Sequence, residues 1–121
     1  MKEWVDLNKE LGKYGELLSR KYLIDKGYYL KEVNYKNKLG EIDIIVQKDN
    51  VIVFIEVKTR KNTKYGLPRE SINYKKQMKI RKVAEEYIIR NKIRNTDFRF
   101  DVMEVLFKDK KYKINHIINA F

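Results

Sequence analysis

Residues 40–58 read GEIDIIVQKDNVIVFIEVK, two apolar runs joined by the polar pair Asp49-Asn50. Ile and Val dominate both runs, and these residue types are typical of buried strands. The sequence therefore predicts two strands, 41–47 and 51–58, that pair through a short turn at Asp49-Asn50. This hairpin is the centre of the predicted fold.

Three charged residues interrupt the apolar runs. Asp43, Glu56 and Lys58 would enter low-dielectric surroundings, which are costly for a charge unless something compensates it. A divalent metal ion would compensate the two carboxylates and a phosphate would compensate the lysine. The alternative is a structural ion cluster on the face of the sheet.

The register of the hairpin brings the two acids together. If the turn aligns the apolar faces, Ile44 lies opposite Ile55, Ile42 shares the face of Ile44 and lies opposite Val57, and Asp43 falls opposite Glu56. Directly opposed residues have Cβ atoms about 5 Å apart. Two carboxylates at that distance repel each other without a cation between them. Lys58 follows on the face of Glu56, with Glu41 beside it.

The periodicity of apolar residues also predicts the helices and strands of the remaining segments. Apolar residues at three- and four-residue spacing predict helices over 8–26 and 72–91, the first with an apolar stripe and the second with Ser71 or Asn73 as cap. Alternation predicts strands over 28–35, 98–107 and 112–118, and a basic loop fills 59–69. We expect one domain over residues 1–121, in the order helix, three strands, helix, two strands. The stripe of the first helix comprises Leu7, Leu11, Tyr14, Leu18 and Tyr22.

Composition narrows the classes of partner and of chemistry. The 121 residues include 28 basic and 17 acidic side chains, and a net charge of +11 indicates a polyanionic partner. The lack of cysteine excludes disulfides, thiolate metal ligands and cysteine nucleophiles. No segment has the length and apolarity of a membrane span or of a signal peptide. We expect a cytoplasmic protein without a membrane partner.

The positive charge is concentrated directly after the hairpin. Residues 60–95 hold 12 Lys and Arg against three Glu, which is +9 of the total of +11. A solvated helix face is the ordinary interpretation of such a stretch. Next to candidate metal ligands, it also predicts contacts with a phosphate backbone, because Lys and Arg supply most sequence-independent affinity for nucleic acids.

The motifs of the chain also resemble a known group of enzymes. Glu16 in the first helix, Asp43 in the second strand and Glu56-Val57-Lys58 in the third resemble the PD-(D/E)XK nuclease superfamily, with Ile42-Asp43 replacing the proline-aspartate pair. Motifs over nearly the whole chain resemble the YraN-like family of small bacterial proteins: Gly12-x-x-Gly15-Glu16, Gly40-Glu41-Ile42-Asp43, Phe54-Ile55-Glu56-Val57-Lys58-x-Arg60, Gly66-x-Pro68, Lys76-Gln77, Arg99-Phe100-Asp101-Val102 and His116-Ile117-Ile118-Asn119-Ala120-Phe121. The resemblance implies an α/β, restriction endonuclease-like three-layer core with a mixed central sheet and the order αβββαββ.

The residue types at these positions suit phosphodiester hydrolysis. Asp43 and Glu56, with the Val57 carbonyl and several waters, would hold one Mg²⁺ or Mn²⁺, because these ions prefer oxygen ligands. Lys58 would position the attacking water or stabilise charge on the phosphate. The resemblance implies that Glu16 is an outer or additional ligand, and that Lys76 and Gln77 lie against the site and the scissile strand. Asp101 and His116 are interpreted as structural residues.

Two classes of function remain open at this point. The first is a metal-dependent endonuclease that acts on DNA, favoured over RNA, with a branched or single-stranded substrate and a homodimer both conceivable. The second is a nucleic-acid-binding module with a nuclease fold but little turnover, acting in DNA uptake, recombination or repair. The nucleic-acid contacts predicted for either class are Arg60, Lys61, Lys64, Lys75, Lys76, Gln77, Lys79 and Lys82.

Overall fold

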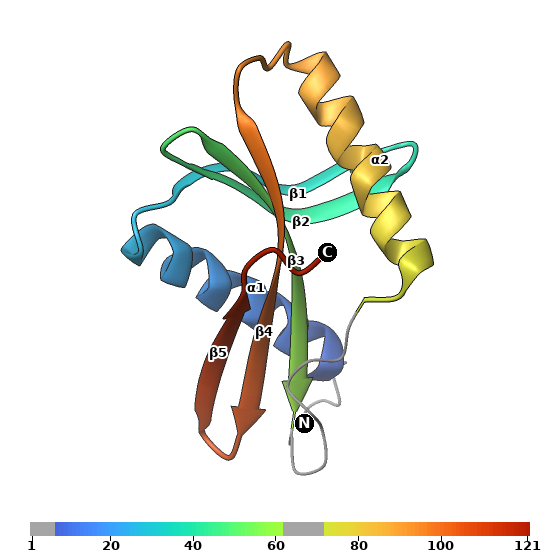
Figure 1. Cartoon of the computed structure of the whole chain (residues 1–121). Coiled ribbons are helices and arrows are strands. Elements are labelled where there is room, and N and C mark those ends of the chain that lie inside the picture. The colour runs from blue at the N-terminus through green and yellow to red at the C-terminus, as the bar shows by residue number, and fades with distance from the viewer. Residues whose placement is uncertain (1–6, 62–71) are drawn as a thin grey trace.

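The computed structural model describes residues 7–61 and 72–121, and within them the order of elements is αβββαββ, as predicted (Figure 1). The elements are α1 (Leu7–Asp25), β1 (Tyr29–Asn37), β2 (Gly40–Lys48), β3 (Val51–Lys61), α2 (Tyr74–Arg90), β4 (Asp97–Lys108) and β5 (Lys111–Ile117). The largest difference from the predicted bounds is in β3, which runs three residues further because it pairs with β4 as far as Lys61 and Phe107. The predicted loop therefore starts later, and most of it lies outside the described residues.

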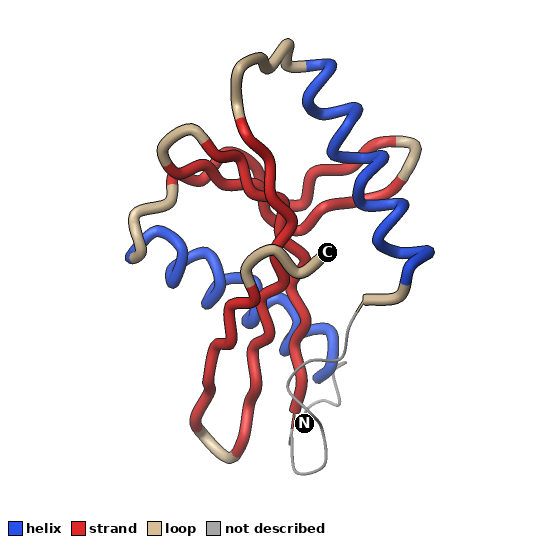
Figure 2. Tube along the Cα trace, viewed as in Figure 1, coloured by secondary structure: helices blue, strands red, loops and turns tan. Residues whose placement is uncertain are grey.

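The five strands form one mixed sheet in the order β1-β2-β3-β4-β5. β1, β2 and β3 are antiparallel neighbours, and so are β4 and β5. β3 and β4 are parallel, since the chain returns from the end of β3 to the start of β4 through the crossover that contains α2. Figure 2 shows these strands in red, with the β4–β5 hairpin extending to the end of the sheet away from α2. The mixed α/β sheet predicted from the sequence is confirmed.

Each helix packs against its own set of sheet residues. Leu23 of α1 lies in a buried cluster with Ile44, Val46, Val53, Ile55 and Met103. Residues of α2 lie in a second cluster with alternate residues of the same strands: Ile80, Val83, Ala84 and Tyr87 against Ile45, Ile52, Phe54 and Val102. Because neighbouring residues of a strand point to opposite faces, the two helices cover opposite faces of the sheet. The helix, sheet and helix form three layers.

The face that α1 buries differs from the predicted stripe. Over residues 10–25 of α1, Gly15, Ser19 and Leu23 are the buried positions, whereas Tyr14 is half exposed and Tyr22 is partly buried against the cluster of Leu23. The reason is a close approach between the helix and β3, where only a glycine leaves room for the side chain of Thr59. This contact fixes the height of α1 on the sheet, and with it the position of Glu16.

The close approach at Gly15 predicts opposite effects for two glycine-to-alanine substitutions in the same helix. A Cβ at Gly15 would meet Thr59 Oγ1, and it would also lie 3.2 Å from Thr59 Cβ, which rotation of the threonine side chain does not move, so a close contact remains. We expect Gly15→Ala to lower the free energy of unfolding by about 1–3 kcal/mol, the usual cost of overpacking. A Cβ at Gly12 meets nothing within 4 Å. Gly12→Ala should therefore raise stability by up to about 1 kcal/mol through helix propensity.

Urea denaturation of the two variants checks this prediction. Equal midpoints for Gly12→Ala and Gly15→Ala would contradict a close contact between α1 and β3.

The described helices include none that is long and apolar enough to cross a membrane.

Candidate functional site

The strands β2 and β3 stop pairing at the point where the predicted site begins. Their ladder of paired residues runs from the pair Lys48–Val51 at the turn to the pair Ile44–Ile55. Beyond it, the backbone N–H of Val57 donates a hydrogen bond of 2.8 Å to Oδ2 of Asp43, a side chain rather than a strand backbone. β2 stays paired with β1 as far as Gly40, and β3 stays paired with β4 as far as Lys61. The two strands therefore diverge, and the Asp43 carboxylate lies across the gap.

This divergence corrects the register predicted from the sequence. The pair Ile44 and Ile55 is confirmed, but the predicted pairs of Asp43 with Glu56 and of Ile42 with Val57 are not formed. The predicted common face of Ile42 and Ile44 is also wrong, because Ile42 packs in the α2 cluster and Ile44 in the α1 cluster.

An irregular backbone on β1 accompanies the change of face. Asn34 lies between the residues paired with Ile44 and Ile42, across from Asp43, and has a left-handed φ of 50°. A residue in that conformation disturbs the alternation of a strand.

The backbone of Val57 presents a second oxygen to the gap. In a strand, the N–H and C=O of one residue point toward the same neighbouring strand, and the N–H of Val57 points toward Asp43 on β2. Its carbonyl is therefore directed to the same edge, where β2 no longer pairs with β3. This orientation agrees with the predicted role of Val57 as a carbonyl ligand.

Glu56 is held by the start of α2. Its carboxylate is buried, and Oε2 lies 2.9 Å from Nζ of Lys76, whose side chain is half exposed. Asn73 caps the helix by accepting a hydrogen bond of 2.8 Å from the backbone N–H of Lys76, which fixes the first turn. Of the two caps predicted, Asn73 is the one observed. The hydrogen bond to Glu56 raises the pKa of Lys76, because it favours the charged ammonium.

Four acids from α1, β2 and β3 influence one another. Burial raises the pKa of Asp43 to about 7, and the negative charge of Glu56 adds to this rise, with smaller contributions from Glu16 and Glu41. Burial also raises the pKa of Glu16, followed by the charges of Glu41 and Glu56. The structure therefore brings Glu16 to the predicted site, and it adds Glu41, whose charge the sequence assigned only to the neighbourhood of Lys58. The site has an excess of negative charge at the gap.

The donor set fits a divalent cation of the Mg²⁺ type. Such ions are bound through one or two carboxylates, with water and substrate phosphate completing the shell, rather than by a cage of protein ligands. Asp43, Glu56 and the Val57 carbonyl offer oxygen atoms only, and burial together with the charge of Glu56 raises the pKa of Asp43. No group of three or more Asp, Glu, His or Cys ready to enclose a metal occurs in the described residues. The geometry thus favours a partly hydrated ion over a tightly enclosed one.

The raised pKa of Asp43 predicts a pH-dependent stability in metal-free protein. Between the usual value of 3.8 and about 7, the folded state holds a proton that the unfolded chain releases, so stability falls as the pH rises through this window. We expect Asp43→Asn to remove this slope and to raise the free energy of unfolding at pH 8 by on the order of 2 kcal/mol. Denaturation in chelator at pH 5, 6.5 and 8 checks it. Asp49→Asn, at an exposed turn, is the matched control and should leave the slope unchanged.

Lys58 lies on the sheet face of Glu56, two residues further along β3. It is half-buried and makes no hydrogen bond or ion pair with the residues that the structure describes, so the predicted contact with Glu41 is not formed there. Its neighbour in register on β4 is Glu104, and the next neighbour on β5 is Asn115.

Glu104 is the residue that sequence reasoning missed. It is fully buried, its Oε1 accepts a hydrogen bond of 3.1 Å from Asn115, and its Oε2 has no donor among the described residues. The sequence did contain an indication of it, because Glu104 interrupts an apolar strand in the same way as Glu56 does.

The predicted nucleic-acid contacts fall into three groups. Lys75, Lys79 and Lys82 are exposed on α2, away from its buried residues. Gln77 is half-buried, and its Nε2 donates a hydrogen bond of 2.8 Å to the carbonyl of Ile72, which holds the start of the helix. Arg60 is half-buried and Lys61 is exposed at the end of β3, whereas Lys64 lies outside the described residues.

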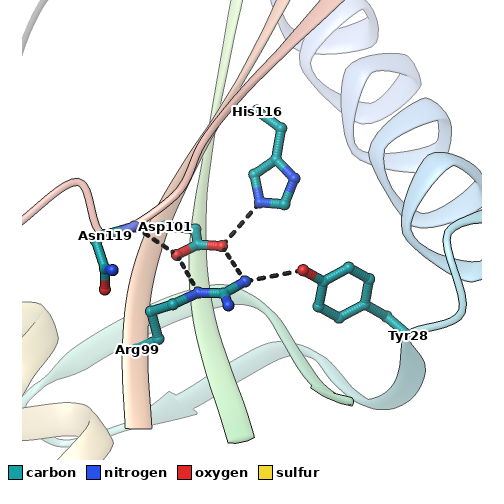
Figure 3. A network of polar contacts seen from close by, with 5 residues as sticks. All are labelled: Tyr28, Arg99, Asp101, His116 and Asn119. Atoms are coloured by element: carbon teal, nitrogen blue, oxygen red, sulfur yellow. Dashed lines mark hydrogen bonds and ion pairs between the residues drawn. The ribbon is translucent and has the colours of Figure 1, made fainter. Parts of the chain in front are cut away.

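A separate buried acid, Asp101, ties the last strands together. Figure 3 shows its carboxylate accepting hydrogen bonds from Arg99 Nε and Nη2 at 3.0 Å and 2.9 Å, and from the backbone N–H of Asn119 at 3.0 Å, with His116 Nε2 at 2.8 Å. Arg99 also donates to the hydroxyl of Tyr28 at 2.8 Å. Burial would raise the pKa of Asp101, but these hydrogen bonds outweigh it and hold the pKa below its usual value. The structural interpretation of Asp101 and His116 is confirmed.

Comparison with known proteins identifies relatives along nearly the whole chain. The model of the family described as "Uncharacterised protein family UPF0102" matches residues 15–105. A UPF0102 protein of Alkaliphilus oremlandii is 51% identical over 95% of this chain and 100% of its own length. One from Clostridioides difficile is also 51% identical, over 94% of this chain and 98% of its own length, and one from Dictyoglomus turgidum is 41% identical over the same shares. The matched segment contains Glu16, Asp43, Glu56 and Lys58.

Proposed function

The chain belongs to the UPF0102 family, whose description names no activity, and we propose from the site itself that it is a metal-dependent endonuclease that hydrolyses DNA phosphodiester bonds. One observation carries the proposal: where β2 and β3 separate, the Asp43 carboxylate accepts the N–H of Val57, next to Glu56, whose charge raises the pKa of Asp43. Mutually repelling acids are a poor choice for stability alone. The site resembles that of the PD-(D/E)XK nucleases and the chain resembles the YraN-like family, and both resemblances support the proposal.

The residues of the site take distinct roles in this reaction. Asp43 and Glu56 hold Mg²⁺ or Mn²⁺, with Glu16 as an outer acid. When bound, such an ion supplies Lewis acidity toward a phosphate oxygen and toward water. Lys58, on the face of Glu56 and without a partner among the described residues, stabilises the charge that develops on the phosphate. Lys76 lies at Glu56 and is half exposed, so its ammonium reaches both the site and a bound strand.

The exposed lysines of α2 supply the contact with the DNA backbone. Lys75, Lys79 and Lys82 recur at helical spacing on the exposed side of the helix. Each lysine that neutralises a phosphate releases a counterion and steepens the salt dependence of binding. Because Lys76 connects the same helix to Glu56, a strand bound along α2 passes close to the site.

A second candidate function is nucleic-acid binding without turnover. The observation that favours it is the ion pair between Lys76 and Glu56, which gives the carboxylate a compensating charge without a metal.

Cleavage assays separate the two candidates. Purified protein with Mn²⁺ should nick supercoiled plasmid or cut branched DNA, and chelator should stop the reaction. A panel of linear, branched and single-stranded DNA and of RNA defines the substrate. If no member of the panel is cut with either Mg²⁺ or Mn²⁺ but DNA is still bound, the binding module is the correct function.

The contact surface on α2 is tested by charge reversal. We expect Lys79→Glu with Lys82→Glu to weaken binding to duplex DNA at least about tenfold and to reduce the slope of log K against log salt by about 2, since two phosphate contacts are lost. Fluorescence anisotropy at several salt concentrations measures both quantities. Lys21→Glu with Lys26→Glu, exposed on and just after α1, makes the same change of charge elsewhere and serves as the control. Equal losses for the two pairs would show that net charge, not α2, determines affinity.

A further inference from the structure

The tip of the β4–β5 hairpin is strongly basic and fully exposed. Residues 108–113, which we call the hairpin end, contain four lysines and one aspartate, a net charge of +3. All six side chains are exposed, and Lys108 pairs with Lys111 and Leu106 with Lys113 across the hairpin. Like charges opposite each other on a hairpin are destabilising, so these lysines are suited to an anionic partner.

Aromatic rings lie on the other face of the same hairpin, because Tyr112 pairs with Phe107 and alternates with Lys111 and Lys113 along β5. Tyr112 and Tyr14 are each half exposed, and the ring of Phe107 lies between them, 6.2 Å from the first and 5.6 Å from the second by ring centroids. The Tyr14 and Phe107 rings are stacked at an interplanar angle of 19°. Exposed rings next to cationic side chains are the combination that binds single-stranded nucleic acids, by stacking on bases and by contact with phosphates.

The hairpin end is also hollowed. A shallow depression of about 490 Å³ is lined by Leu106, Lys108, Asp109, Lys111, Tyr112 and Lys113. Volumes of this order hold small organic ligands. Its lining combines ammonium groups with one aromatic ring, which suits a nucleotide unit of phosphate and base.

The hairpin end is connected to the site by β3. Leu106 and Lys108 follow Glu104 at two-residue spacing along β4, so they lie on the sheet face of Glu56 and Lys58. Leu106 pairs with Lys113 and Lys108 pairs with Lys111, which places Lys108, Lys111 and Lys113 on that same face. Lys61 lies next to Phe107 in register, five residues after Glu56 and about 17 Å from it at roughly 3.3 Å per residue. A stacked strand covers this length in about five nucleotides at roughly 3.4 Å each, and an extended single strand covers it in fewer.

We propose that the hairpin end binds a single-stranded segment of the nucleic-acid substrate within about five nucleotides of the phosphate at Glu56. Lys108, Lys111 and Lys113 contact its phosphates, and one base stacks on Tyr112 where the strand passes around the edge of β5. The base must be unstacked from a neighbour, as in a single strand, because inside a duplex both faces of a base are covered by its neighbours. The proposal rests on the proposed function and gives it a substrate class: nucleic acid with a single-stranded part next to the cleavage position.

Binding measurements without metal test the hairpin end separately from catalysis. Anisotropy of a labelled 15-nucleotide single strand and of a blunt duplex is followed in chelator for the full chain and its variants. We expect Tyr112→Ala to weaken binding of the single strand about tenfold, the usual effect of losing one stacked base, and to change duplex binding less than twofold. Tyr112→Phe should keep the affinity. Lys111→Gln with Lys113→Gln should reduce the salt slope for the single strand by about 1.4.

The control is Tyr29→Ala, since Tyr29 is more exposed than Tyr112 and lies on β1, away from the hairpin end. Equal affinity of wild type and Tyr112→Ala for the single strand, with Lys111→Gln/Lys113→Gln also unchanged, overturns the proposal. So does loss of affinity with Tyr29→Ala to the same extent. A Tyr112-dependent affinity for anionic lipid vesicles in place of the single strand would overturn it as well. If wild type cleaves DNA with Mn²⁺ while the hairpin-end variants bind the single strand as wild type does, the proposed function stands without the hairpin end; if wild type binds no nucleic acid, both fail.

Discussion

Replacing Glu56 with glutamine is expected to abolish metal-dependent DNA cleavage, with a fall in rate of at least about 1,000-fold. Glutamine keeps the size of the side chain but removes the negative charge that holds the cation, and a metal ion contributes several kcal/mol to the stabilisation of a phosphoryl transition state. We expect no other carboxylate to take over the role of Glu56. It is the acid that β3 places at the gap, and Asp43 already accepts a hydrogen bond from the N–H of Val57. The measurement is single-turnover cleavage of plasmid or branched DNA in Mn²⁺.

The same substitution should leave DNA binding in place. The Lys76 ammonium loses its charged partner and becomes available to a phosphate, so affinity in chelator is expected to stay the same or to rise slightly. Calorimetry should show that Mn²⁺ binding to the protein alone is lost. Glu85→Gln, on the exposed side of α2, is the matched control and should retain both cleavage and metal binding. Full activity of Glu56→Gln would rule out the proposed site.

Asp101→Asn is expected to produce the largest loss of stability, about 3–5 kcal/mol, which is the usual effect of breaking a buried ion pair on one side. The amide would leave the Arg99 guanidinium without its charged partner, and an NH₂ group would face either His116 or the N–H of Asn119, both of which now contact carboxylate oxygens. A protein of this size has only about 5–15 kcal/mol of stability in total. Thermal and urea denaturation measure the loss, and DNA binding through α2 should persist below the new midpoint.

Two further measurements separate the charge from the hydrogen bonds. Because the folded state lowers the pKa of Asp101, its contribution is complete above the usual pKa and is lost as the pH falls through the folded value. The stability difference between wild type and Asp101→Asn should therefore shrink in acid. In the double variant with Arg99→Met, the two losses should not add, since the residues share one contact. Additive losses would mean that Arg99 and Asp101 do not stabilise each other.

The fold could be predicted because its elements are locally consistent. The β2–β3 hairpin has strong alternation and a clear turn, and α2 has a regular apolar face, so the order of elements and the pair Ile44 and Ile55 were both accessible from the sequence. Glu56 and Lys58 could be placed on one face for the same reason.

What could not be predicted depends on contacts between distant segments. The divergence of β2 and β3 follows from the side chain of Asp43 accepting the N–H of Val57, a choice that no periodicity reveals. The buried face of α1 is set by the fit of Gly15 against Thr59, so the apolar stripe was the wrong guide. The local hydrogen bond from Gln77 Nε2 to the carbonyl of Ile72 was likewise not accessible from the sequence.

The parallel pairing of β3 with β4 has a consequence for the order of folding. α1 to β3 form a continuous meander with short turns, and this segment supplies Glu16, Asp43, Glu56 and Lys58. β4 joins β3 only through residues 46 positions apart in sequence, and such non-local pairing is slow because the chain loses loop entropy before any contact forms. We expect the acids to approach one another early, and docking of β4 and α2 to limit the folding rate. Lys76 then reaches Glu56 only in that last step, so the acids repel one another without compensation before it. Conditions that relieve this repulsion should therefore increase the folding rate, and not only decrease the unfolding rate.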